Sequence, residues 1–205
     1  MSKFTKVQTQ INDLLAVSKA LKEMGIEHEL DLQGKLTYDA YYEHRNNAFL
    51  VIHKGRHSTK DGQEYKIAYE DTVLVRAEDG AGFEWLHSTH STDGLPEAIN
   101  QAYAEGKIRQ VAAAQGYRIQ SATKLQDGSK RMIIQVGGSG AKAEVDISHG
   151  GSIAAAVKGI KGNACAPIIR RIEEAAGGEV EDSGNTGEFF QGGGGGAGRG
   201  IGTSA

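Results

Sequence analysis

The first residues of the chain alternate between apolar and polar side chains, and a helical period then replaces this alternation. Residues 5–11 place threonine, valine or isoleucine at every second position, which is the period of a strand with one buried face. Residues 14–24 repeat apolar side chains every three or four positions, as an amphipathic helix does. Asn12 or Asp13 can cap its start and Gly25 its end. The pattern therefore predicts a strand followed by a helix.

The same two patterns predict further strands and one long helix. Strands are expected at three stretches, residues 27–32, 48–53 and 65–76, the last with a bend at Glu70 and Asp71. Residues 95–115 have a helical period, with a break expected at Gly106. Residues 117–122 and 131–136 flank a Gln-Asp-Gly-Ser turn sequence, which favours a hairpin.

A glycine-rich stretch at residues 137–140 indicates a flexible joint before a smaller unit. Beyond it, residues 143–148 and 152–158 flank a His-Gly-Gly turn and precede a helical stretch that begins near Cys165. The expected fold class is α+β. We predict a ferredoxin-like two-layer sandwich with extra strands over residues 1–136, a small ββα domain over 141–180 and a disordered Gly-rich tail over 181–205.

Composition and charge argue against several classes of protein. The 205-residue chain has a formal net charge of -3 and one cysteine, so it has neither the basic surplus of a dedicated nucleic-acid binder nor an internal disulfide. Its first residues lack the apolar core of a signal peptide, and no apolar run reaches the roughly 20 residues of a membrane span. We expect a cytoplasmic protein with no cofactor and no membrane partner.

The single cysteine, Cys165, has two interpretations. Its place near a helix start would lower the pKa of the thiol and suit a nucleophile or redox sensor. The other interpretation is that Cys165 shares one apolar helix face with Ile168, Ile169 and Ile172 and fills space in a core. The packing interpretation is favoured, because only His149 in this part of the sequence could serve as a base.

Two further groups of residues have ligand-binding patterns. The turn formed by Gly159, Lys161, Gly162 and Asn163 could hold an anion between backbone amides, but a plain tight turn is the favoured explanation. Two histidine pairs have spacings that can place two imidazoles on one metal ion, namely His53 with His57 and His87 with His90. No cysteine or recognised acidic motif accompanies these histidines, so ordinary exposed loop histidines are the simpler reading.

The densest aromatic cluster consists of Tyr38, Tyr41 and Tyr42, followed by Arg45. Such residues favour protein interfaces, because they combine a large contact area with a hydrogen-bonding tip. They could also stack on nucleic-acid bases, which the net charge disfavours, or pack against the sheet. The packing and interface interpretations stay open at this point.

Two stretches resemble known families. The opening MSKFTKVQTQINDLLAVSKALKEMG and residues 114–136 resemble an uncharacterised family found as a conserved hypothetical reading frame in cyanobacteria and plastid genomes. The stretch KGIKGNACAPIIRRIEEAAGG resembles a short bacterial domain of unknown function that often accompanies the first family. The resemblance implies a bacterial-type protein in which the two are fused, and genes of these families often lie near those of AAA+ ATPases.

These observations together favour a non-enzymatic protein-binding or adaptor protein, accessory to an AAA+ ATPase. A thiol- or metal-dependent enzyme, built on Cys165 or on the four histidines, is the alternative. An RNA-binding module that uses a sheet face is the second alternative.

Overall fold

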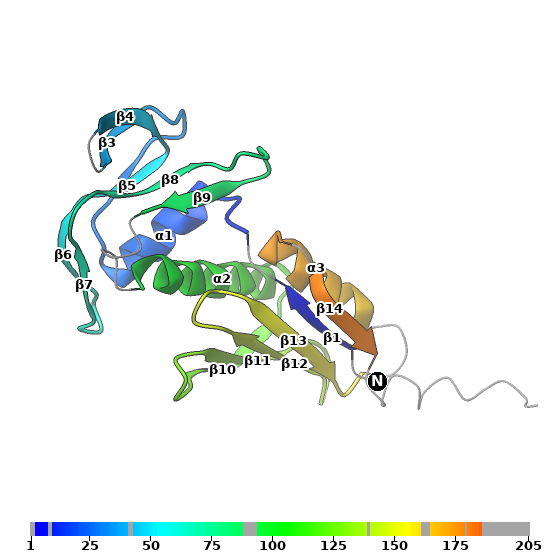
Figure 1. Ribbon diagram of the computed structural model, residues 1–205. Helices are drawn as coiled ribbons and strands as arrows, with labels where there is room; N and C mark the ends of the chain where they lie inside the picture. The colour runs from blue at the N-terminus through cyan, green and yellow to red at the C-terminus, as the bar shows by residue number, and fades with distance from the viewer. Residues whose placement is uncertain are drawn as a thin grey trace, which may run out of the picture.

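The computed structural model describes residues 3–7, 10–40, 43–87, 94–138, 140–160, 165–178 and 180–185. Within these ranges the chain forms three helices, α1 (Leu14–Met24), α2 (Leu95–Ala114) and α3 (Ala166–Ala176), together with antiparallel sheets (Figure 1). The predicted α+β class is confirmed, as is the helix that follows the last predicted hairpin. None of the described helices is long and apolar enough to cross a lipid bilayer.

The largest sheet has six strands. In spatial order they are β10 (Arg118–Lys124), β11 (Lys130–Gln135), β12 (Lys142–Ile147), β13 (Ile153–Lys158), β1 (Lys3–Val7) and β14 (Val180–Asn185). The four strands from β10 to β13 form a meander, and β1 pairs antiparallel with both β13 and β14. The sheet differs from a ferredoxin-like sheet, which is built from β-α-β units, because four successive strands here pair through turns alone.

The predicted joint at residues 137–140 lies in the turn between two paired strands. Ile134 of β11 pairs with Ala143 of β12, so the hairpin expected to stand in a separate ββα unit extends the larger sheet. The domain boundaries themselves stay a prediction about independent folding.

The start of the tail is a correction, because residues 181–185, expected to be disordered, belong to β14, whose backbone pairs with β1. The rest of the tail lies outside the described residues.

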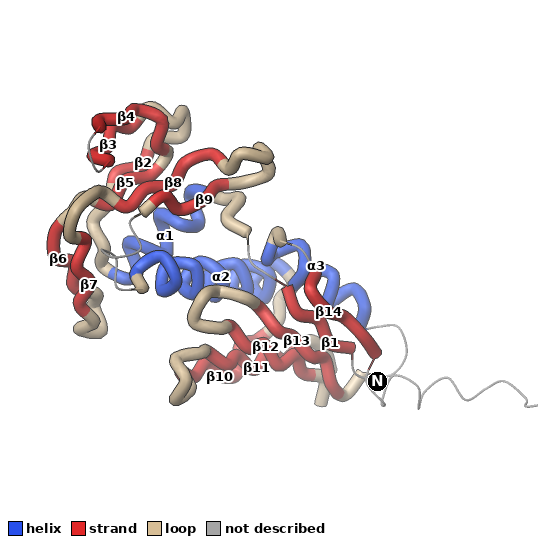
Figure 2. The backbone as a smooth tube through the Cα atoms, viewed as in Figure 1, coloured by secondary structure: helices blue, strands red, loops and turns tan. Residues whose placement is uncertain are grey.

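A second sheet and two hairpins account for the remaining strands (Figure 2). The second sheet has the order β2 (Glu29–Leu30), β5 (Leu50–Ile52), β8 (Thr72–Arg76) and β9 (Phe83–Leu86). The hairpins are β3 (Leu36–Ala40) with β4 (Glu43–Ala48), and β6 (Gly55–Ser58) with β7 (Glu64–Ile67). The stretch predicted as one strand over 65–76 is thus β7 and β8, separated at the predicted bend.

Helix α2 lies between the two main sheets and contributes to two cores. Leu95, Ile99 and Tyr103 pack with α1 and the four-stranded sheet. Ala104, Ile108 and Ala112 pack with α3 and one face of the six-stranded sheet. Because both flanks are buried, α2 continues through Gly106 without the predicted break. A third, small core lies between the β3–β4 hairpin and the other face of the four-stranded sheet.

The first helix forms where the sequence predicts it. Of the two predicted caps, Asp13 is the one used: its Oδ1 accepts a hydrogen bond from the backbone N–H of Ala16 at 3.0 Å. Gly25 ends the helix in the left-handed region with φ of 88°, which glycine adopts without steric cost. Strand β1 covers the start of the predicted strand, and Ile11 at its predicted end forms an isolated bridge with Phe83, while residues 8 and 9 lie outside the described residues.

Candidate functional site

The aromatic cluster is only partly at the surface. Tyr38 is 3% exposed and packs in the small core beneath the β3–β4 hairpin. Its strand partner is Arg45 of β4, which is exposed. Tyr41 and Tyr42 lie outside the described residues. Tyr38 therefore anchors the hairpin, and Arg45 is the described residue of this cluster that a partner could reach.

Cys165 is completely buried just before α3. It packs in the core between α2, α3 and the six-stranded sheet, so its place agrees with the packing interpretation. Gly159, with φ of 76°, lies against the backbone of Gly140, and a Cβ there would come within 2.2 Å of the Gly140 carbonyl oxygen. The other members of the predicted anion-binding turn, Lys161, Gly162 and Asn163, lie outside the described residues. That turn stays a prediction.

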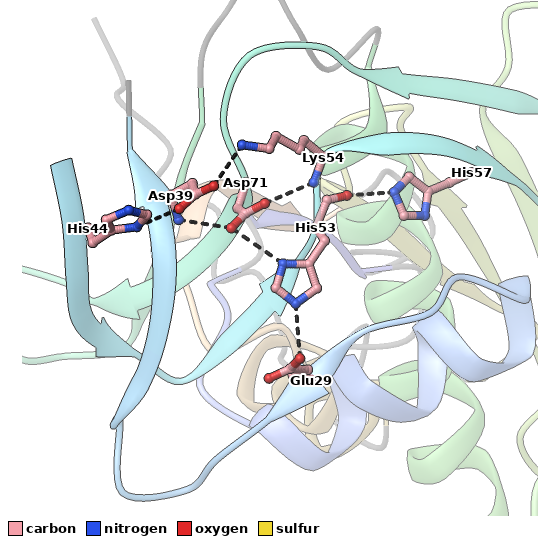
Figure 3. A network of polar contacts seen from close by, with 7 residues as sticks. All are labelled: Glu29, Asp39, His44, His53, Lys54, His57 and Asp71. Atoms are coloured by element: carbon pink, nitrogen blue, oxygen red, sulfur yellow. Dashed lines mark hydrogen bonds and ion pairs between the residues drawn. The ribbon is translucent and has the colours of Figure 1, made fainter. Parts of the chain in front are cut away.

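The structure brings the first histidine pair together in a polar network (Figure 3). The Nε2–H of His57 donates a hydrogen bond to the backbone carbonyl of His53 at 2.8 Å. His87 lies directly after β9, and His90 lies outside the described residues. Among the residues that the structure describes, no group of three His, Cys, Asp or Glu side chains could hold a metal ion.

Asp71 is the centre of the network. Its side chain is 4% exposed. One carboxylate oxygen, Oδ1, accepts the backbone N–H of Lys54 at 2.9 Å, and the other, Oδ2, accepts the backbone N–H of Asp39 at 2.9 Å. The backbone N–H of Asp71 in turn donates to the Asp39 carbonyl at 3.0 Å. One buried carboxylate therefore ties the β3–β4 hairpin to the segment between β5 and β6.

The imidazole of His53 lies between two carboxylates. Its Nε2 is 2.9 Å from Oε1 of Glu29, and its Nδ1 is 3.4 Å from Oδ2 of Asp71. The hydrogen bond to Glu29, aided by the negative charge of Asp71, raises the pKa of His53 above its ordinary value although partial burial opposes this. Both ring nitrogens are engaged. In this geometry His53 holds the β2 edge and the β5–β6 segment together, and neither nitrogen is free to accept a proton from a substrate.

Two exposed polar contacts, one of them the ion pair of Lys54 with Asp39, extend the network to the β3–β4 hairpin. The Lys54 ammonium lies 2.6 Å from Oδ2 of Asp39, and Nδ1 of His44 lies 2.6 Å from Oδ1 of the same carboxylate. The hydrogen bond from Lys54 lowers the pKa of Asp39, and the same contact raises the pKa of Lys54. Exposed pairs of this kind contribute little to stability alone, so their main effect is to orient the hairpin.

A surface hollow of about 570 Å³ lies beside this network, lined in part by His28, Glu29, His53 and His57. The Nδ1–H of His28 donates to the Ile26 carbonyl at 3.1 Å, and Nε2 lies 2.7 Å from the Ser18 hydroxyl, from which it accepts a hydrogen bond when the ring is neutral. Burial lowers the pKa of His28, although the backbone hydrogen bond opposes this. The hollow thus has one histidine that favours the charged form and one that favours the neutral form.

The sequence analysis did not identify Glu29, Asp39 or Asp71 as site residues. Asp71 was expected only to mark a bend, and its partners come from separate strands. The available signal was a carboxylate directly before an apolar strand, which is too common to be specific.

The molecule is thus an α+β protein in which a buried carboxylate pins two hairpins to a four-stranded sheet. Residues 20–133 match a family model described as Protein of unknown function (DUF1257), and residues 144–190 match one described as Protein of unknown function (DUF2997). The first match spans more than half of the chain, so the chain belongs to the DUF1257 family. The expected fusion of two families is confirmed. Comparison with curated proteins and with solved structures gives no significant match.

Proposed function

We propose that this chain is a non-enzymatic protein-binding or adaptor protein, accessory to an AAA+ ATPase. The observation that carries the proposal is the attachment of the β3–β4 hairpin and of the start of β6 to the buried Asp71 carboxylate (Figure 3). Both hairpins project from the four-stranded sheet (Figure 1). A two-stranded hairpin is marginally stable by itself. Anchoring it in advance lowers the conformational entropy that a partner must remove on binding.

The exposed sides of the hairpins have the chemistry of a polar recognition surface. His44, Arg45 and Asn46 are exposed on β4, and Arg56 and Ser58 are exposed on β6. Arginine and hydrogen-bonding side chains on a rigid support are typical of specific protein interfaces. The choice of an ATPase as the partner rests on the family resemblance alone.

The test is site-specific photo-crosslinking with the full chain. A photoreactive residue replaces Asn46 in β4 or Arg56 in β6, and the matched control carries it at Ala154, an exposed position of β13 in the other sheet. Adducts formed in cells that make the protein are identified by mass spectrometry. We expect one discrete protein adduct from the two hairpin positions, with AAA+ ATPase peptides in it, and none from position 154.

Two outcomes would contradict the proposal. If neither the Asn46 nor the Arg56 position gave a protein adduct, the hairpins would not be a protein-binding surface. An adduct that contains no ATPase would keep the binding function and refute the named partner. Binding of the identified protein is then measured with purified components, because crosslinking alone does not give an affinity.

A further inference from the structure

A groove runs along the seam between α1 and α2 and widens into a cup between two hairpin ends. The cup has a volume of about 310 Å³. One wall comes from the β6–β7 turn, including Lys60 and Asp61, and another from Lys124 and Lys130 of the β10–β11 hairpin. A second hollow of about 170 Å³ continues along the two helices. The two hollows share lining residues, so they form one groove, and the cup is its hairpin end.

The floor of the groove consists of small side chains. Ala20 comes from α1, and Ala98, Ala102 and Gly106 come from α2. The three α2 residues are four positions apart, so they lie on one face of the helix. Small residues at this spacing allow another backbone to approach closely.

Gly106 is the unusual member of the floor. A glycine inside a helix costs about 0.5–1 kcal/mol relative to alanine. A Cβ added to Gly106 would meet no atom within 4 Å, so the packing of the described residues leaves room for alanine. The missing methyl group therefore serves no contact within this part of the chain. Gly106 lines both hollows, so the open space beside it lies where they adjoin, and an external backbone could approach there.

The groove has more cationic than anionic side chains, although the chain as a whole has a net charge of -3. The cations are Lys19, Lys60, Arg109, Lys124 and Lys130, and the carboxylates are Glu23, Asp61 and Glu105. Glu105 is neutralised within the groove by Lys130, at 2.7 Å, and by Arg109, at 2.6 Å. Burial raises the pKa of Glu105, but these hydrogen bonds outweigh it and leave the pKa below its ordinary value.

Two further cations, Lys60 and Lys124, line the cup at the hairpin end of the groove. The Lys60 ammonium donates to the backbone carbonyl of Lys22 at 2.8 Å, a contact that leaves its positive charge in place. Lys124 is attracted to Asp61 at longer range. The cup is lined by more cations than carboxylates, namely Lys60, Arg109, Lys124 and Lys130 against Glu23, Asp61 and Glu105. It therefore favours an occupant with negative charge.

We propose that this groove binds an acidic α-helix of a partner protein, seated against Gly106 with its carboxylates toward Lys60 and Lys124. The proposal rests on the binding function above and names the chemistry of the partner. A helix fits better than an extended peptide, because α1 and α2 satisfy their own backbone hydrogen bonds and offer no strand edge for pairing. Helices pack at about 8–10 Å between axes when small residues line the contact.

The test uses the full chain and a synthetic, fluorescently labelled helical peptide of about 20 residues with alanine and leucine on one face and glutamate beside it. Fluorescence anisotropy measures its affinity, and a peptide with lysine in place of each glutamate is the charge control. We expect the glutamate peptide to bind and its affinity to fall with added salt. The lysine peptide should bind at least about tenfold more weakly, which corresponds to about 1.4 kcal/mol.

Two variants locate the binding site. Gly106→Leu should weaken the glutamate peptide at least about tenfold by filling the floor, and circular dichroism will verify that the helix is kept, since leucine favours helix over glycine. Lys124→Glu should weaken it by a similar factor, whereas Lys142→Glu, an exposed charge reversal on β12 outside the groove, should leave it unchanged. Equal binding of both peptides, or equal affinity of all variants, would overturn the proposal.

The peptide-binding test of the groove and the crosslinking test of the hairpins can fail independently. Adducts from Asn46 or Arg56 without peptide binding would refute the groove alone. Peptide binding that depends on Gly106, without any adduct at the hairpins, would refute the hairpin surface alone.

Discussion

The Oδ2 atom of Asp71 lies 3.4 Å from Nδ1 of His53, so a nearly buried carboxylate contacts an imidazole that is about half exposed. Asp71→Asn should lower the free energy of unfolding by about 1–3 kcal/mol. The reason is that an amide would point a donor at the backbone N–H of either Lys54 or Asp39, both of which now donate to the carboxylate. Urea unfolding measures the loss.

The control for this variant is Glu78→Gln, a carboxylate-to-amide change at an exposed position near the β8–β9 turn. It should change the unfolding free energy by less than about 0.5 kcal/mol. Equal stability of the Asp71 and Glu78 variants would show that the network does not anchor the hairpins.

The histidines His53 and His28 should titrate on opposite sides of their ordinary pKa of 6.5. The folded-state pKa of His53 is raised, so its favourable contribution is fully present below the unfolded value and is lost as the pH rises through the folded pKa. Burial lowers the pKa of His28, so the folded state disfavours its protonated form, and the protein loses stability as the pH falls below 6.5. Imidazole proton shifts measured by NMR give both midpoints.

Stability measurements with His53→Gln and His28→Gln check the sign. The stability lost in His53→Gln should become smaller as the pH rises above neutrality. The stability lost in His28→Gln should become smaller as the pH falls below 6.5. A His53 midpoint below 6.5 would mean that Glu29 and Asp71 do not stabilise its charged form.

Two glycines should respond to alanine in opposite ways. Gly106→Ala should stabilise the protein by about 0.5–1 kcal/mol, because the helix gains propensity and the new Cβ meets nothing within 4 Å. Gly34→Ala should destabilise it, because Gly34 has φ of 70° and a Cβ there would lie 2.5 Å from Cζ of Phe49. Thermal unfolding of both variants measures the difference. Destabilisation by Gly106→Ala would contradict the open space at the groove floor.

Gln101 joins α2 to two hairpin turns. Its Nε2 donates to the carbonyl oxygens of Gly128 at 2.9 Å and Ser148 at 3.0 Å, and the side chain is buried. Gln101→Glu should destabilise the protein by at least about 1–3 kcal/mol, because a carboxylate would face carbonyl oxygens without a donor. Urea unfolding between pH 5 and 8 checks this, with the loss growing as the pH rises and the new carboxyl ionises. A loss that is independent of pH would contradict the assigned contacts.

Cys165 should resist thiol reagents in the folded protein. The side chain is 0% exposed, so modification requires an opening of the core. Labelling with a chromogenic disulfide should be at least about a hundredfold slower in buffer than in 6 M guanidinium chloride. Rapid labelling of the folded protein would show that the sulfur is accessible and would revive the thiol interpretation.

Local structure could be predicted from the sequence because its causes are local. Helix α1 has its apolar period, its Asp13 cap and its Gly25 end within one short segment. The β10–β11 and β12–β13 hairpins are likewise set by turn residues between adjacent strands. For Tyr38 the packing and interface interpretations both stayed open, because the sequence of β3 alone does not show which face of the β3–β4 hairpin lies against the sheet.

The pairing of β1 and the Asp71 network could not be predicted, because both depend on residues far apart in the sequence. The alternating pattern of β1 does not specify a partner strand, and only tertiary packing selects β13 and β14. The network takes Glu29 from β2, Asp39 from β3 and His53 from the end of β5. Spacing along the chain contains no sign that these side chains converge.

The place of β1 between β13 and β14 has a consequence for how the protein is made. At a translation rate of about 5–20 residues per second, on the order of ten seconds pass between the synthesis of β1 and the synthesis of its partner strand β13, which begins at residue 153. During that time the first strand has no neighbour in its sheet, whereas α1 and the four-stranded sheet can already assemble. Completion of the larger sheet is therefore a late step with high contact order, and a chain stalled before β13 would leave β1 unpaired and would expose the edge of β12 that β13 normally covers.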